Sequence, residues 1–176
     1  MGRREINVLI FTAVCLFLLT ACNSDATNEN PVSLPEVACK PEDVNADPPF
    51  TIAETHSAVP PETPLADQIE TYYGVALIEN SLTNSSAFCN LYEMADETAA
   101  AKLWAQLCRD GVTPVETTEA FAPPTVGDSA CAYQSAAFRE LHFQQGRIVV
   151  SVWGDSGGQG VVDWAEAVNG RLQQSN

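Results

Sequence analysis

A serine framed by glycines is the residue best placed to do chemistry in this sequence. Ser156 lies in the pentapeptide GDSGG at residues 154–158. A serine hydroxyl becomes a nucleophile when a histidine, itself held by a carboxylate, takes its proton. The chain has two histidines, His56 and His142, and both precede Ser156. A serine hydrolase using Ser156 is therefore the alternative function against which the other features are weighed.

GDSGG resembles the segment around the nucleophilic serine of chymotrypsin-like proteases, and it also matches the G-x-S-x-G elbow of α/β-hydrolases. His56, however, lies in ETHSA and not in the TAAHC-like context of the proteases, and no histidine follows Ser156 as in the hydrolases. We therefore expect no catalytic residue. Asp155 and Ser156 are expected to cap the final helix, with Gly157 and Gly158 allowing the turn before it.

The start of the chain has the layout of a secretory signal. After two arginines, the apolar run Val8 to Leu19 is shorter than the roughly 20 residues that cross a bilayer core. The run ends in Leu19-Thr20-Ala21-Cys22, which resembles the lipobox of bacterial lipoproteins. The resemblance implies removal of residues 1–21 as a signal peptide, a lipid on the sulfur of Cys22, and an acyl chain such as palmitate on the new amino terminus. The protein is then expected on the extracytoplasmic face of the cell membrane or in the outer membrane.

Two of the six cysteines are not free to form disulfides, because Cys15 is removed with the signal and Cys22 is acylated, and four remain. They are Cys39, Cys89, Cys108 and Cys131. Zinc sites usually use close pairs of cysteines, and these four are scattered, so we expect no metal and no cofactor. An even number of cysteines in an oxidising compartment predicts two disulfides, with three possible pairings.

Among these pairings we favour Cys108 with Cys131. Cys108 lies near the end of a predicted helix on its apolar face, and the irregular segment that follows can bring Cys131 back to that end. Cys39 then pairs with Cys89 by elimination. The main competing pairing joins Cys89 to Cys131 and Cys39 to Cys108.

The mature chain is strongly acidic. The whole chain has 8 basic and 23 acidic residues, of which 2 basic residues and 1 acidic residue lie in residues 1–21. The mature chain therefore has 6 basic and 22 acidic residues and a formal charge of −16. Such a surface repels phosphate backbones and anionic lipid headgroups, so we expect no nucleic-acid partner. Membrane attachment then depends on the lipid anchor, and the remaining partner is an unknown protein or small ligand.

Residues 22–64 are predicted to form a tether rich in Pro, Asp and Glu. They contain few large apolar side chains, and so they cannot bury enough surface to offset the entropy lost on ordering. A disulfide from Cys39 would hold the middle of the tether against the domain. Residues 65–176 are long enough for one modest core and are predicted to form a single domain.

Apolar residues in this domain follow strand and helix periods in turn. Strands are predicted over residues 72–78, 87–94, 129–133, 139–144 and 147–153. One helix is predicted to follow Asp96 as its N-cap and to end at Gly111, and a second amphipathic helix closes the chain. The fold class is therefore α+β, an antiparallel sheet of about five strands with two amphipathic helices packed on it.

The last two predicted strands form a hairpin. Gln145 and Gly146 are expected to form its turn, because glycine supplies the positive φ that a tight hairpin needs. Alternation along the first of these strands puts Phe143 on the buried face. His142 is then expected to point to solvent beside Glu140.

The order of these elements, with a GDSA turn at residues 127–130, resembles the small extracytoplasmic domains of many uncharacterised bacterial lipoproteins. It is also similar to the extracellular sensor domain of some mycobacterial serine/threonine kinases. The resemblance covers about residues 72–172. It implies an antiparallel sheet flanked by helices, a binding or sensing role, and no catalytic residue to carry over. We therefore expect a non-catalytic membrane-anchored lipoprotein that exports a domain for an unknown ligand or partner.

Overall fold

A computed structural model of the chain describes residues 32–79, 85–110, 119–155 and 160–175. All of these residues belong to one compact unit, Pro31–Asn176. The predicted signal peptide and Cys22 lie outside the described residues. Among the helices of the described ranges, none is long and apolar enough to span a bilayer.

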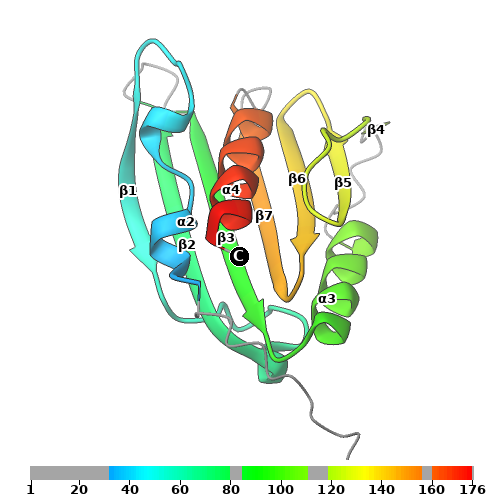
Figure 1. Cartoon of the computed structure of the whole chain (residues 1–176). Coiled ribbons are helices and arrows are strands. Elements are labelled where there is room, and N and C mark those ends of the chain that lie inside the picture. The colour runs from blue at the N-terminus through cyan, green and yellow to red at the C-terminus, as the bar shows by residue number, and fades with distance from the viewer. Residues whose placement is uncertain (1–31, 80–84, 111–118, 156–159, 176) are drawn as a thin grey trace, which may run out of the picture. The chain divides into compact units, whose positions relative to one another are not determined.

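Seven strands of the described chain form one antiparallel sheet in the order β1-β2-β3-β7-β6-β5-β4 (Figure 1). Their bounds are Phe50–His56 (β1), Ile69–Glu79 (β2), Ser86–Met94 (β3), Glu119–Ala120 (β4), Ser129–Gln134 (β5), Phe138–Gln145 (β6) and Ile148–Asp155 (β7). The predicted α+β class with an antiparallel sheet is confirmed. The sheet has more strands than predicted, because β1 lies in the segment assigned to the tether and β4 is very short.

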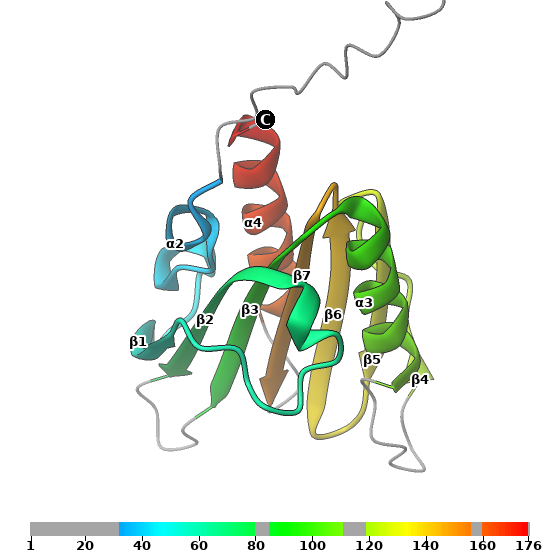
Figure 2. The ribbon, with the colours of Figure 1, turned by 90° about the horizontal axis from the view of Figure 1, so that it is seen from below.

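Three α-helices of the described chain pack on this sheet: α2 (Leu34–Val37), α3 (Glu97–Asp110) and α4 (Val161–Ser175). Two short 3-10 helices, η1 (Pro41–Asp43) and η2 (Ala66–Gln68), precede β1 and β2. In Figure 1, α2 and α4 lie side by side on the sheet, with α2 over β2 and α4 over β7 and β6. Figure 2 shows α3 apart from them, beside β5 and β6.

Strand register shows that α4 and α3 cover opposite faces of the sheet. Leu141 of β6 lies opposite Val152 of β7, and both belong to the core that includes α4. The neighbouring pair, His142 and Ser151, points to the other face, because side chains alternate along a strand. On that second face α3 packs against β2, β3 and β7 in a separate core.

The larger core lies between the sheet and the helices α2 and α4. Its fully buried side chains include Leu34, Leu77, Leu91, Leu141, Phe143, Val150, Val152, Trp164, Val168 and Leu172. Complete burial of one such side chain stabilises the folded state by about 1.5–3 kcal/mol relative to exposure. This core is therefore the main source of hydrophobic stabilisation in the domain.

The smaller core holds α3 on the second face. Asp96 caps α3 as predicted, because its Oδ1 accepts the N–H of Ala99 at 2.7 Å. Ala100 and Leu103 are fully buried against the sheet, and Trp104 packs beside them. The predicted apolar stripe of this helix therefore does face the sheet.

Two glycines with positive φ lie in the turns around the last hairpin, and hydrogen bonds from both of them hold the hairpin to the rest of the domain. The turn between β6 and β7 starts at Gly146, one residue later than predicted, with φ 54°. Its N–H is bound by Oδ2 of Asp128 at 2.8 Å. Gly127, with φ 60°, lies so close to the backbone of β6 that a Cβ would clash, and its N–H donates to Oδ1 of Asn169 at 2.9 Å. The GDSA segment thus joins the hairpin to α4.

Residues 32–64 belong to the compact unit, so the prediction of a tether up to residue 64 is wrong. Leu34 and Val37 of α2 are almost completely buried, and β1 pairs along β2. Composition misled the prediction, because most of the few large apolar residues before Ile52 are buried and a disulfide offsets part of the ordering entropy. A tether from Cys22 can include only residues 22–31, which lie outside the described part of the chain.

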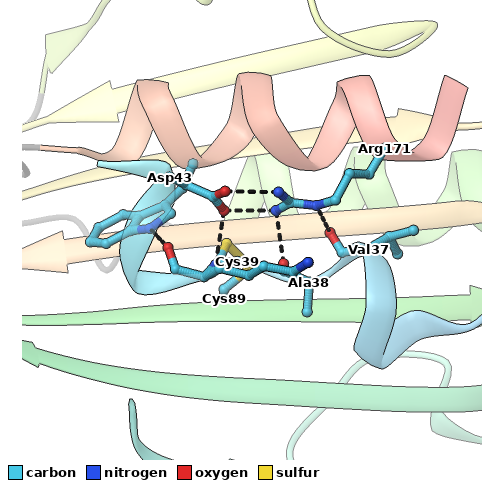
Figure 3. A network of polar contacts seen from close by, with 8 residues as sticks. Val37, Ala38, Cys39, Asp43, Cys89 and Arg171 are labelled. Atoms are coloured by element: carbon cyan, nitrogen blue, oxygen red, sulfur yellow. Dashed lines mark hydrogen bonds and ion pairs between the residues drawn. A yellow bond between two sulfur atoms is a disulfide. The ribbon is translucent and has the colours of Figure 1, made fainter. Parts of the chain in front are cut away.

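Arg171 on α4 fastens this N-terminal segment to the domain (Figure 3). Its guanidinium binds both carboxylate oxygens of Asp43, each at 2.7 Å. It also donates to the carbonyl oxygens of Val37 at 3.1 Å and Ala38 at 2.8 Å. Asp43 in turn accepts the N–H of Lys40 at 2.8 Å. Charge-assisted bonds of this bidentate kind are among the stronger ones in proteins.

A disulfide and a tryptophan hold the same segment. Cys39 is bonded to Cys89 of β3, with Cα atoms 6.1 Å apart (Figure 3). Nε1 of Trp164 donates to the carbonyl oxygen of Lys40 at 2.9 Å. Its ring meets the ring of Phe50 edge-on, with centroids 4.9 Å apart. The segment is therefore attached to both the sheet and α4.

The second disulfide joins Cys108, near the end of α3, to Cys131 of β5, with Cα atoms 6.0 Å apart. The hydroxyl of Tyr133 donates to the carbonyl oxygen of Cys108 at the same place. These two disulfides are the pairing favoured from the sequence. The competing pairing is not formed, because Cys89 belongs to the core under α4 while Cys131 lies opposite His142 on the other face.

Replacement of Arg171 tests the attachment of the N-terminal segment. We expect Arg171→Ala to lower the free energy of unfolding by about 2–4 kcal/mol, because it removes the cation paired with a buried carboxylate and the donor to two carbonyl groups. Arg171→Lys should recover only part of this loss, because an ammonium group cannot form the same bidentate pair. Urea denaturation of the oxidised protein measures both values.

The matched control is Arg139→Ala, since Arg139 binds the amide oxygen of Gln134 and no carboxylate in the described chain. Its cost should be about 1 kcal/mol. Equal losses for the two alanine variants would contradict a special role of the Asp43 pair.

Two buried tyrosines should make the fold sensitive to alkali. Burial raises the pKa of Tyr92 well above its ordinary value, and the nearby phenol of Tyr72 raises it further. Burial also raises the pKa of Tyr72, whose ring lies 5.2 Å from that of Tyr92. The unfolded chain loses these protons near pH 10 while the folded chain keeps them, so stability present below about pH 10 is lost as the pH rises further.

We therefore expect the unfolding free energy to fall above about pH 10 by at most about 1.4 kcal/mol per pH unit for each phenol. Tyr92→Phe should remove the part that belongs to Tyr92. Urea titrations across this pH range measure the slope. Identical slopes for the wild type and Tyr92→Phe would show that this phenol does not contribute.

Candidate binding face

The glycine-framed motif is described only in part. Ser156, Gly157 and Gly158, and with them the predicted alternative of a hydrolase that uses Ser156, lie outside the described residues. Oδ1 of Asp155, the last residue of β7, accepts the N–H of Ser86 on β3 at 2.7 Å. Asp155 therefore ties β7 to β3. Its predicted role as a helix cap is wrong, because α4 begins several residues later.

The two histidines lie at different places on the sheet. His56 ends the edge strand β1, with Nε2 at 3.5 Å from Oε2 of Glu54. His142 of β6 is only 1% exposed, so the prediction that it points to solvent is wrong. The reason is that α3 covers the second face of the sheet, so both faces of β6 are buried although its sequence alternates as in a strand with one solvent-facing side.

His142 is buried beside a carboxylate without forming a hydrogen bond. Its Nε2 lies 3.0 Å from Oε1 of Glu140, but the two groups are not aligned for a hydrogen bond. Its Nδ1 has no hydrogen-bond partner in the described part of the chain. Ser151 lies directly opposite on β7. An activated serine needs a base bonded to its hydroxyl, so Ser151, His142 and Glu140 do not form a triad in this geometry.

Aromatic side chains are exposed on the same face, outside the core of α3. Phe88 of β3 and Trp153 of β7 lie opposite each other, with ring centroids 5.3 Å apart. The ring of Phe138 on β6 lies 6.5 Å from that of Trp153. Phe88 is 40% exposed, and the other two are partly exposed. We call Phe88, Phe138 and Trp153 the aromatic cluster.

Strand register places acidic residues on both sides of this cluster. One row of directly opposed residues crosses five strands in the order Glu54, Ala76, Phe88, Trp153 and Glu140. Neighbouring strands are about 4.8 Å apart, so the two ends of the row are separated by about 19 Å. Glu54 has a side chain 67% exposed, and that of Glu140 is 11% exposed. The row is therefore apolar in the middle and acidic at both ends.

The adjacent row is mainly polar and leads toward the buried histidine. It consists of His56, Gly74, Asn90, Ser151 and His142. Tyr72 lies over Gly74, where a Cβ would clash with its hydroxyl, and donates to Oδ1 of Asn90 at 2.7 Å. The absence of a side chain at position 74 lets this tyrosine lie across the sheet.

A small acidic pocket opens at the end of the sheet, next to the aromatic cluster. It is lined by Asn45, Ala46, Asp47, Phe50, Glu79, Ser85, Ser86 and Asp155. Its volume of about 130 Å³ is below the roughly 300 Å³ of pockets that hold drug-sized ligands. Among the lining residues, Asp155 lies two residues from Trp153 on β7 and opposite Phe138, so it adds negative charge beside the cluster, whereas Phe50 belongs to the core under α4.

Comparison with known proteins adds no relative. No family model matches the chain, and no curated protein matches it. Within the described ranges, no group of three or more His, Cys, Asp or Glu side chains is placed to hold a metal ion. The candidate site is therefore argued from its own geometry.

The aromatic cluster was not identified from the sequence. Alternation along β3 puts Phe88 on the same face as Tyr92 and Met94, and nothing local distinguishes the three. The course of α3 decides that Tyr92 and Met94 are buried while Phe88 stays exposed. Strand order and register would have brought Phe88 next to Trp153, but both are properties of the folded chain.

A substitution at position 142 tests whether the buried histidine is only a packing residue. We expect His142→Leu to keep the fold and to raise the free energy of unfolding by about 1 kcal/mol, because it removes a buried polar ring without hydrogen bonds. The control Asn90→Leu should instead destabilise the fold, because it removes the acceptor of Tyr72. Urea denaturation compares the two. A loss of stability in His142→Leu would show that the imidazole makes a favourable contact.

Proposed function

We propose that this chain is a non-catalytic, membrane-anchored lipoprotein whose extracytoplasmic domain binds a ligand or partner through the face that carries the aromatic cluster. The observation that carries this proposal is the Phe88–Trp153 pair, with Phe88 exposed and Trp153 partly exposed, in the middle of a sheet row that ends in a glutamate on each side. Large aromatic side chains are usually buried, and a contiguous exposed group of them is typical of an interaction surface.

The sequence around Cys22 supports the anchored state. Leu19-Thr20-Ala21-Cys22 follows an apolar run of the length of a signal peptide. The described domain begins at residue 32, so nine residues, or ten Cα–Cα steps, separate it from Cys22. A fully extended chain of this length spans at most about 35 Å. The domain would therefore work close to the membrane surface and not at the end of a long stalk.

The charge of the chain supports an anchor made of lipid. A formal net charge of −15 over the whole chain opposes contact with anionic headgroups and with nucleic acids. Two or more acyl chains hold a protein stably in a bilayer, whereas one chain gives only marginal binding. The proposed location is the extracytoplasmic face of a membrane, with the lipid of Cys22 as the attachment.

Replacement of Cys22 tests the anchor. We expect Cys22→Ser to lose acylation and to move from the membrane fraction to the soluble fraction, because no sulfur is left to carry the lipid. Mass spectrometry of the amino-terminal peptide and fractionation of the cells measure the two effects. Cys15→Ser is the matched control, because that cysteine lies in the predicted signal peptide and should leave the mature protein unchanged.

A membrane pool of undiminished size in Cys22→Ser would contradict the proposed anchor. The same conclusion would follow if the amino-terminal peptide of the wild type began before Cys22 and carried no acyl chain.

A further inference from the structure

The two carboxylates at the ends of the aromatic row each lie beside a histidine, Glu54 beside His56 and Glu140 beside His142. The described arginine side chains are engaged elsewhere. Arg139 contacts Gln134 and the ring of Phe121, Arg147 binds Glu70 and Glu93, and Arg171 binds Asp43. Phe121 packs on the core under α4, so Arg139 also lies on the opposite face. The row thus combines exposed aromatic rings with carboxylates that these arginines do not neutralise.

We infer that this face binds a basic segment of a partner protein, with apolar residues in its middle and lysine or arginine toward both ends. The inference rests on the proposed function and names the class of partner. Carboxylates at the ends of the row form charge-assisted bonds to ammonium or guanidinium groups. The rings of Phe88 and Trp153 offer apolar contact and a π-face that attracts the same cations.

The spacing of the row sets the length of the segment. Glu54 and Glu140 lie four strand spacings apart, which is about 19 Å. An extended peptide advances about 3.3 Å per residue, so about six residues reach from one glutamate to the other. Two or three apolar side chains between the basic ends then lie over Phe88 and Trp153. Asp155 beside Trp153 provides a further carboxylate for a basic end that is not in line with Glu140.

Charge argues against two other occupants of this face. A second copy of the chain would bring the same net charge of −15, so the two copies would repel each other. An anionic bilayer is disfavoured for the same reason. A basic protein segment is attracted by the charge and by the aromatic rings together.

The test uses the mature lipidated protein in nanodiscs of zwitterionic lipid and a fluorescent ten-residue peptide. The peptide has two lysines at each end and leucines in the middle. One matched peptide has glutamates in place of the lysines, and another has serines in place of the leucines. Fluorescence anisotropy should give a Kd for the first peptide at least about tenfold lower than for either matched peptide, and this Kd should rise with salt.

Variants on the row locate the binding. Phe88→Ser and Trp153→Ser should each weaken binding about tenfold, since central aromatic anchors carry most of the affinity of an interface. Glu54→Gln should weaken it about threefold, and its 67% exposed side chain can be replaced without disturbing a core. Ile52→Ser is the control, because Ile52 is 52% exposed but lies opposite Leu77 of the core under α4. It should leave the Kd within about twofold.

The inference is overturned if the basic peptide binds no better than the acidic one, or if Ile52→Ser weakens binding as much as Phe88→Ser. It is also overturned if sedimentation shows a dimer that Phe88→Ser dissociates, because a second copy would then occupy the face. If Cys22 is acylated but the peptide does not bind, this inference fails, and the proposed function stands with a different ligand. If the peptide binds but Cys22 is not acylated, the proposed anchor fails, and this inference stands.

Discussion

The disulfide between Cys108 and Cys131 controls how much of the second sheet face is covered. Helix α3 starts at its N-cap Asp96, directly after β3, and this bond fixes its other end over β5. The hydroxyl of Tyr133 binds the carbonyl oxygen of Cys108 at the same end. The helix therefore packs on β3, β7 and β6 and leaves Phe88 exposed. Both the burial of the histidine on β6 and the openness of the aromatic face follow from this one placement.

Local features of the domain could be predicted from the sequence because their causes are local. Alternation located the long strands, Asp96 marked the start of α3, and the glycine at position 146 marked the hairpin turn to within one residue. The pairing of the cysteines followed from the apolar stripe of α3, since Cys108 lies on the side that faces the sheet. In each case a few neighbouring residues carry the physical reason.

Other features depend on residues far apart in the sequence and could not be predicted in the same way. Few residues of the segment from Leu34 to Phe50 are apolar, yet Arg171 and Trp164 on α4 hold it by its backbone carbonyls, which have no sequence signature. The placement of helices on both faces reversed the expected environment of His142. The aromatic cluster arises from strand order, because β7 inserts next to β3 and brings Trp153 beside Phe88.

Cys89 and Phe88 are consecutive residues of β3 whose side chains point to opposite faces of the sheet. Cys89 is bonded to Cys39 on the side of the chain that leads toward Cys22, and Phe88 belongs to the face proposed to hold a partner. In a chain anchored at Cys22, tension from a partner at Phe88 would pass through one peptide bond and one disulfide into the sixteen residues between Cys22 and Cys39. Of the described helices, only α2 lies on this path, and the strands other than β3 lie outside it. A mechanical pull would therefore load α2 and these covalent bonds, while the other strands and helices stay unloaded.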